Sequence, residues 1–288
     1  ARVARRMLSA RVSRPTTSVL VALLTAVVPG SLSAAEPAGQ PTVDPGGVVR
    51  WHGSGSRTCG LGDEEWPAID DTCWYPIDVL ADEGPLTLRR TRGGATERTT
   101  VHVGPYPYPE QKLTVDPEMV HPPEAQLERI RLETQRVRAL WNRPGPARFT
   151  LPLAPPLRPL PEARSFGSRR ILNDEPRSPH SGVDFSGATG TPVFAVADGL
   201  VVLADEHFFA GKSIYIDHGN QLVSMYFHLS EISVTEGDVV LSGTTIGAVG
   251  TTGRVTGAHL HFGVRWHGAR IDPRVLLGPS SAVTTIGD

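Results

Sequence analysis

Short runs of β-branched and aliphatic residues, separated by glycine, proline and aspartate, recur along most of this 288-residue chain. Runs of about four to eight residues between turn-forming residues are typical of strands. In the C-terminal half they include Gly199-Leu-Val-Val-Leu, Leu222-Val-Ser-Met-Tyr-Phe-His and His259-Leu-His-Phe-Gly-Val-Arg. The chain is therefore expected to be mostly β, with an antiparallel sheet in its C-terminal part (163–280).

The residues before this C-terminal part fall into three segments that differ in their pattern of apolar residues and prolines. Residues 46–120 contain β-like runs broken by turns, which predict a small β-sandwich-like domain. Residues 121–142 place apolar side chains at helical spacing, which predicts an amphipathic helix packed on its own protein. The apolar positions are Leu127, Ile130, Val137 and Trp141. Prolines recur through residues 143–162, so this stretch cannot form a helix or a central strand and is expected to be a stiff linker.

The N-terminal segment 1–35 has the pattern of a signal peptide. Five arginines precede the apolar run Val19 to Val28, and Ser33-x-Ala35 follows it. The run is shorter than the roughly 20 apolar residues that span a bilayer, and it suits export and cleavage. We expect a periplasmic or secreted protein without a stable membrane span after cleavage.

Removal of this segment leaves 23 Lys and Arg residues against 30 Asp and Glu residues, a net charge of −7. Binding to nucleic acid depends largely on Lys and Arg side chains that neutralise phosphates, so the balance argues against a nucleic-acid partner. Cys59 and Cys73 are the only cysteines. In an oxidising compartment they are expected to form a disulfide that stabilises a small domain by about 2 to 4 kcal/mol.

Histidines and one aspartate form the clusters that can carry chemistry: His180-Ser-Gly-Val-Asp184, His228 and His259-Leu-His261. The last two histidines alternate along an expected strand, so their side chains leave the same face. A catalytic zinc takes three His or carboxylate ligands and keeps an open position, at which it activates water and polarises a carbonyl. A remaining neutral imidazole suits proton transfer near neutral pH.

One further histidine is expected to have no role. His218 lies in Asp217-His-Gly-Asn220, between two strand-like runs. This composition predicts a hairpin turn, in which His218 is exposed and inert.

Seven motifs follow one another between about Ser165 and Leu277. They are Phe166-Gly167-x-Arg169, Pro179-His180-x-Gly-x-Asp184-Phe185, Gly190-Thr-Pro-Val193, Ala197-Asp-Gly199, Tyr226-x-His228-Leu229, Gly250-x-Thr-Gly253 and His259-Leu-His261-Phe262. In this order they resemble the lysostaphin and LytM type of zinc endopeptidase. The resemblance implies a lysostaphin-like, lipoyl-hybrid-like fold, with Zn²⁺ bound by His180, Asp184 and His261.

The same resemblance implies that His228 and His259 are catalytic, although the sequence does not divide the roles of base and oxyanion stabiliser between them. The implied substrate is the stem peptide of peptidoglycan, cut in a Gram-negative wall at a D-alanyl to diaminopimelate bond. Residues 46–141 resemble, less specifically, the leader domain of Gram-negative members, through Gln111-Lys-Leu-Thr-Val115. Regulators of the cell wall or of the division machinery are candidate partners.

Two other functions are compatible with parts of the sequence. A silent member of the family would activate other wall hydrolases without cutting, but such members have lost ligands and all five residues are present here. The run from Val234 to Gly250 resembles the hairpins of lipoyl and biotinyl carrier domains. A carrier needs a lysine at an exposed hairpin tip, and Lys212 lacks the usual flanking residues.

Overall fold

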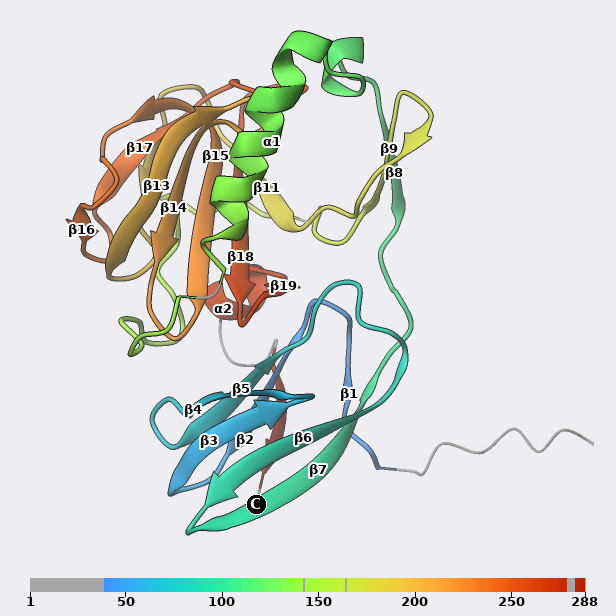
Figure 1. The fold of residues 1–288 in the computed structure, drawn as a ribbon, viewed down its shortest axis with the longest axis vertical. Coiled ribbons are helices and arrows are strands. Elements are labelled where there is room, and N and C mark those ends of the chain that lie inside the picture. The colour runs from blue at the N-terminus through green and yellow to red at the C-terminus, as the bar shows by residue number, and fades with distance from the viewer. Residues whose placement is uncertain (1–38, 142, 164, 279–282, 288) are drawn as a thin grey trace, which may run out of the picture. The chain divides into compact units, whose positions relative to one another are not determined.

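A computed structural model of the chain describes residues 39–141, 143–163, 165–278 and 283–287. The predicted signal peptide, residues 1–35, lies outside these ranges. Within them, no helix is both long enough and apolar enough to cross a membrane. Strands make up most of the regular structure (Figure 1), which confirms the predicted mostly β fold class.

Two sheets share one core in the N-terminal β region, the arrangement of a β-sandwich. One sheet has the strand order β1-β7-β6-β3-β4, and the other has the order β20-β2-β5. Strand β20, from the end of the chain, pairs in parallel with β2. Buried side chains of both sheets, such as Val49, Tyr75 and Leu88, form the core. The strands are β1 (Thr42–Val43), β2 (Val48–His52), β3 (Ser56–Leu61), β4 (Glu64–Pro67), β5 (Thr72–Pro76), β6 (Gly84–Arg92), β7 (Ala95–Val103) and β20 (Thr284–Gly287).

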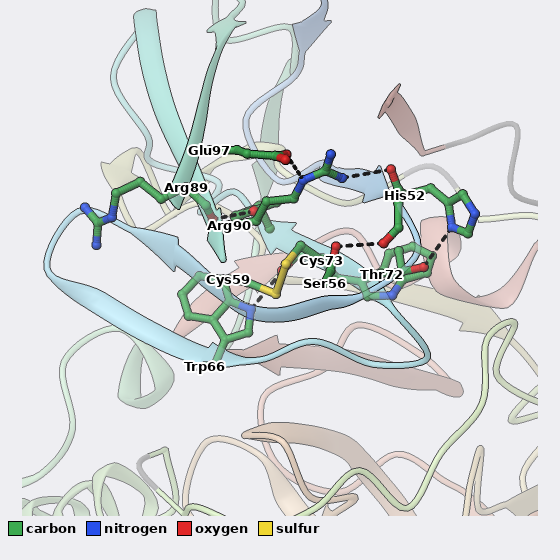
Figure 2. The surroundings of a disulfide bond; sticks show 12 residues. His52, Ser56, Cys59, Trp66, Thr72, Cys73, Arg89, Arg90 and Glu97 are labelled. Atoms are coloured by element: carbon green, nitrogen blue, oxygen red, sulfur yellow. Dashed lines mark hydrogen bonds and ion pairs between the residues drawn. A yellow bond between two sulfur atoms is a disulfide. The ribbon is translucent and has the colours of Figure 1, made fainter. Parts of the chain in front are cut away.

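The two sheets are cross-linked through buried side chains (Figure 2). Cys59 on β3 and Cys73 on β5 form the disulfide predicted from the sequence. Arg90 on β6 is 2% exposed, and it donates to Glu97 at 2.6 Å and to the carbonyl of His52 at 2.9 Å. A covalent bond and a buried guanidinium thus connect strands of the two sheets.

Helix α1 (Glu124–Arg138) lies inside the predicted helical range, but it buries none of its own side chains. Leu127, expected on the apolar face, is 50% exposed. Val137, also expected on that face, packs against a buried cluster of the C-terminal sheet that includes Leu203 and Tyr215. Polar contacts also attach the helix to this sheet. Arg136 pairs with Asp205 at 2.8 Å, and Glu133 accepts the backbone N–H of Phe208 at 3.0 Å.

The proline-rich segment contains no helix or strand, as its composition predicts, but it is not a free linker. Phe149, Leu153 and Leu157 are buried in the core of the C-terminal sheet. The backbone N–H of Leu153 donates to Leu276, and that of Ala154 donates to Val196. Apolar residues between the prolines therefore attach this segment to the sheet along its length.

The C-terminal sheet has nine strands, and all of its pairings are antiparallel. Its main path has the order β11-β18-β15-β14-β13-β16, while β12 pairs with β17 and β19 with β18. The elements are β11 (Gly182–Ser186), β12 (Pro192–Phe194), β13 (Gly199–His207), β14 (Gly211–Asp217), β15 (Leu222–Ile232), β16 (Val239–Val240), β17 (Thr245–Val249), β18 (His259–Trp266), β19 (Ala269–Ile271) and helix α2 (Arg274–Leu277). The predicted antiparallel C-terminal sheet is confirmed.

A small fourth sheet brings together segments from both sides of helix α1. It has the order β10-β9-β8, with β8 (Glu110–Leu113), β9 (Arg169–Leu172) and β10 (Glu175–Pro176). Strand β8 pairs in parallel with β9, so the chain before the helix runs beside the chain after the proline-rich segment (Figure 1). The short helix η1 (Pro117–Met119) follows β8.

The expectation that His218 is exposed is wrong. The β14–β15 hairpin forms as predicted, but His218 is 0% exposed. Its Nδ1 lies 2.8 Å from the carbonyl of Asp198, and its Nε2 lies 2.7 Å from Ser224 Oγ. The proline-rich segment covers this turn, because Arg148 donates its backbone N–H to the carbonyl of His218. The sequence motif identified the turn but not the segment that buries it.

Candidate metal centre

Two paired strands bring the predicted metal ligands together. In the antiparallel register of β11 and β18, Asp184 lies directly opposite His261. Directly opposite residues project to the same face of a sheet, so their side chains meet. His180 precedes β11 and reaches the same point, where His180, Asp184 and His261 form a group able to hold a metal ion.

The three donor atoms converge closely. His180 Nε2 lies 2.8 Å from His261 Nδ1 and 3.1 Å from Asp184 Oδ1. His261 Nδ1 lies 2.9 Å from the same carboxylate oxygen. Ligands at 2.0 to 2.2 Å from a tetrahedral zinc are about 3.3 to 3.6 Å apart, so small shifts outward would suffice. Two imidazoles and a carboxylate are also the donor types that zinc takes in catalytic sites, and the residues therefore fit the ion.

The position of the His261 ring depends on a residue without a side chain. A Cβ atom on Gly182 would lie 2.7 Å from His261 Nε2 and 2.6 Å from the carbonyl oxygen of Phe262. On its other side the ring stacks on Phe227, with centroids 5.1 Å apart and planes 7° apart. The imidazole is therefore held between a glycine and an aromatic ring.

Hydrogen bonds orient the other two predicted ligands. His180 Nδ1 lies 2.9 Å from the carbonyl of Ser165. A carbonyl only accepts, so Nδ1 carries the proton and Nε2 keeps its lone pair for the centre. Ser165 Oγ accepts the backbone N–H of Asp184 at 2.9 Å. Arg170 donates to Asp184 Oδ2 at 2.9 Å, which leaves Oδ1 directed at the two histidines.

The electrostatics of the group favour the ionisation states that bind a cation. Burial alone would raise the pKa of Asp184, but the neighbouring imidazoles of His180 and His261 hold this pKa far below its usual range. Burial lowers the pKa of His261 to about 4, against the opposing effect of Asp184. At neutral pH the site therefore holds a carboxylate and a neutral imidazole, the forms that act as metal ligands.

Strand β18 also delivers His259 to this centre. Its Nε2 lies 3.6 Å from Asp184 Oδ1, while Leu260 between the two histidines is 0% exposed. His259 Nδ1 lies 2.8 Å from the carbonyl of Gly257. This contact keeps the proton on Nδ1 and leaves Nε2 free toward the centre.

His228 reaches the same place through an irregularity in β15. Between its pairings with Ile214 and Lys212 on β14, strand β15 contains an extra residue, and His228 has a φ of 65°. This conformation is uncommon outside glycine, and an extra residue re-aims a side chain. The ring centroid of His228 consequently lies 5.0 Å from that of His259 and 6.0 Å from that of His261.

The environment of His228 keeps its imidazole neutral. Burial lowers the pKa of His228 to about 3, with a further contribution from His261. Its Nδ1 lies 2.9 Å from the carbonyl of Thr252, so this histidine also presents an unprotonated Nε2. The structure thus brings all five residues singled out in the sequence into one cluster.

A groove of about 320 Å³ adjoins this cluster. His180, His228 and His261 line one part of it. Five other side chains of the wall were not predicted from the sequence: Arg170, Arg177, Phe209, Phe227 and Arg254. Their only signal in the sequence is closeness to the motifs, because the contacts themselves are tertiary.

Lys212, considered above as a carrier lysine, lies within strand β14 and not at a hairpin tip. Its Nζ donates to the carbonyl of Ser230 at 2.9 Å. The structure therefore does not support a swinging-arm carrier.

Comparison with known proteins points to the same region of the chain. Residues 178–273 match the model of peptidase family M23. Over 99 residues the chain is 48% identical to the peptidoglycan DD-endopeptidase ShyA of Vibrio cholerae, a match that covers 34% of this chain and 23% of that protein. Over 105 residues it is 39% identical to the DD-carboxypeptidase/endopeptidase Mpg of Neisseria meningitidis, covering 36% of this chain and 24% of that protein. The chain thus spans about a quarter of these curated relatives.

One solved structure is similar over most of the chain. It is a Pseudomonas aeruginosa protein assigned to peptidase M23, with a TM-score of 0.62 and 29% sequence identity. The match covers 83% of this chain and 96% of that chain. The similarity therefore includes the N-terminal β region as well as the C-terminal sheet. The matched residues 178–273 include the whole histidine and aspartate cluster, so this part of the chain is a peptidase family M23 domain.

Proposed function

We propose that this protein is a zinc-dependent endopeptidase that hydrolyses peptide cross-links of bacterial peptidoglycan. The observation that carries the proposal is the convergence of three donor atoms, 2.8 to 3.1 Å apart, beside two further histidines. The names of the relatives give the substrate class, because ShyA is a peptidoglycan DD-endopeptidase and Mpg is a DD-carboxypeptidase/endopeptidase. The bond we expect to be cut is the D-alanyl to diaminopimelate cross-link.

In this proposal His180, Asp184 and His261 hold the zinc. The ion, when bound, supplies a Lewis acid that activates water and polarises the scissile carbonyl. Arg170 and Ser165 fix the orientation of these ligands through the hydrogen bonds described above. Groups that hold ligands in place commonly affect metal affinity by about tenfold to a hundredfold.

His228 and His259 are the proposed catalytic residues. Both donate Nδ1–H to a backbone carbonyl, so both present a lone pair on Nε2 that can accept the proton of the attacking water. A histidine in this state cannot donate to a developing oxyanion until it has gained a proton. We therefore propose that one of them accepts the proton, and that a protonated imidazole then stabilises the oxyanion or protonates the leaving amine.

The silent regulator is the alternative that an experiment must separate. Purified protein, taken without its signal segment, is incubated with isolated peptidoglycan sacculi, with and without a chelator. The released muropeptides are identified by mass spectrometry. Loss of cross-linked dimers that the chelator abolishes supports the proposal, whereas protein that binds no zinc and leaves the dimers intact supports the regulator.

Variants assign the roles within the same assay. His228→Ala and His259→Ala are expected to keep zinc and to lose turnover, because neither belongs to the ligand set. His261→Ala is expected to lose both. Full activity in all three variants would refute the proposal. The proposed location, outside the cytoplasm, is tested by fractionation of cells that express the full chain.

A further inference from the structure

Three arginines line the groove beside the proposed metal centre. Arg170 lies on β9, Arg177 follows β10, and Arg254 lies in the connection between β17 and β18. We call these three residues the arginine cluster. They border the same cavity as His180, His228 and His261.

The guanidinium groups are close enough to influence one another. Burial lowers the pKa of Arg254, and the positive charges of Arg170 and Arg177 lower it further. Such mutual repulsion is unfavourable unless negative charge lies nearby. The chain as a whole has a formal net charge of −2, so this concentration of positive charge is local.

The charges in the groove are only partly balanced. Arg170 pairs with Asp184 at 2.9 Å, and Arg177 pairs with Glu175 at 2.8 Å. Among the described residues, no carboxylate lies within ion-pair distance of Arg254. One carboxylate of the two, Asp184, also belongs to the proposed ligand set. The groove therefore keeps an excess of positive charge, and a zinc ion would increase it.

Neutral groups hold Arg254 in place without neutralising it. Its Nη1 donates to the carbonyl of Met119 at 3.2 Å, and its guanidinium lies over the ring of Phe209 at 4.7 Å. The carbonyl of Val120 accepts from Arg177 Nη2 at 3.2 Å. The η1 turn thus holds two members of the cluster. A guanidinium oriented in this way offers paired donors that match the geometry of a carboxylate.

We propose that Arg254, with Arg170 and Arg177 around it, binds a carboxylate of the substrate peptide beside the scissile bond. This inference rests on the proposed endopeptidase function and adds a specificity determinant to it. Arg254 positions the peptide and takes no part in the chemical step. The groove accordingly prefers peptides with a free carboxylate at this place over neutral ones of the same shape.

The test uses two synthetic cross-linked peptides that differ in one group. In both, a D-alanyl to diaminopimelate bond is scissile, and the neighbouring diaminopimelate carboxyl is either the free acid or the primary amide. We expect the wild-type protein to cleave the acid with a kcat/KM about tenfold to a hundredfold higher, mainly through a lower KM, as for hydrogen bonds to charged groups. Arg254→Gln should lose this preference, because cleavage of the acid slows by much more than cleavage of the amide.

Arg158→Gln is the matched control. Arg158 also lies over a phenylalanine ring, at 4.6 Å from Phe194, but it is exposed and does not line the groove. This variant loses the same charge and is expected to keep the acid preference of the wild type. Arg254→Lys keeps the charge without the planar fork and should keep part of the preference.

An unchanged preference in Arg254→Gln would overturn the inference while leaving the endopeptidase function intact. Should this variant fail to fold, the salt dependence of the wild type decides, because screening must reduce a preference that rests on charge. A preference independent of salt would overturn the inference. If the protein cleaved neither peptide, that result would count against the proposed function. The affinities of the protein for the acid and the amide peptide would then be compared by fluorescence anisotropy, and equal affinities would overturn the inference of a carboxylate site.

Discussion

Replacing Gly182 with alanine tests how tightly the sheet determines the metal centre. The new Cβ would lie 2.6 Å from the carbonyl oxygen of Phe262 and 2.7 Å from His261 Nε2. Both distances are well below a normal contact of about 3.5 Å, so either strand β18 or the His261 ring has to move by most of an ångström. The ring is the more mobile of the two, and its movement would displace the donor atom Nδ1.

The magnitude follows from these contacts. Overpacking in a well-packed site costs about 1 to 3 kcal/mol of folding free energy. A displaced ligand should weaken zinc binding about 10- to 100-fold, the loss that is typical when a group supporting a ligand is removed. Competition with a chromophoric chelator measures the zinc affinity, and urea denaturation of the metal-free protein measures the stability.

Gly145→Ala is the control for this substitution. A Cβ atom on Gly145 would meet no heavy atom within 4 Å, and this glycine has no positive φ. We expect the stability of the variant to remain within about 0.5 kcal/mol of the wild type and its zinc affinity to be unchanged. If Gly182→Ala bound zinc as tightly as the wild type, the reasoning that the glycine makes room for the ligand ring would be refuted.

Three further results are expected. The double variant Cys59→Ala, Cys73→Ala should have a free energy of unfolding in urea that is about 3 kcal/mol lower, the value for a disulfide that closes a loop of about 15 residues. Its zinc content should not change. Unchanged stability would contradict this prediction. Arg170→Gln should weaken zinc binding about 10- to 100-fold in a chelator competition, because Asp184 loses the hydrogen-bond donor to its Oδ2. The circular dichroism spectrum should stay unchanged. A zinc affinity equal to that of the wild type would show that Arg170 does not position Asp184. Burial lowers the pKa of His218 to about 4. As the pH falls below about 6.5, His218 therefore gains a proton in the unfolded chain before it does so in the folded protein. This difference should lower the free energy of unfolding by about 3 kcal/mol between pH 6.5 and pH 4. Denaturation across that range should show a smaller loss in His218→Gln, and parallel curves would refute the assignment.

Much of the candidate site could be predicted because its local part follows the geometry of a strand. His259 and His261 alternate along β18, and the period of two places both imidazoles on one face. The meeting with Asp184 depends on the register between β11 and β18, which is set by contacts between segments far apart in the sequence. Only the order of the motifs, through the family resemblance, indicated that these residues belong together.

Other features could not be predicted because tertiary contacts determine them. The positive φ of His228 accompanies an extra residue in β15, and no glycine at this position indicates such a conformation in the sequence. His218 lies in a hairpin turn that normally faces solvent, yet the proline-rich segment covers it. Leu127 has helical spacing, but α1 contacts the sheet through Val137 and charged side chains and leaves this leucine exposed.

The central claim is that His180, Asp184 and His261 together hold one zinc ion. Its most direct test is the zinc content of the purified wild-type protein and of His261→Ala, measured by inductively coupled plasma mass spectrometry after dialysis against zinc-free buffer. We expect about one zinc per wild-type chain and almost none in the variant. A wild-type protein without zinc, or a variant that retains the full content, would contradict it.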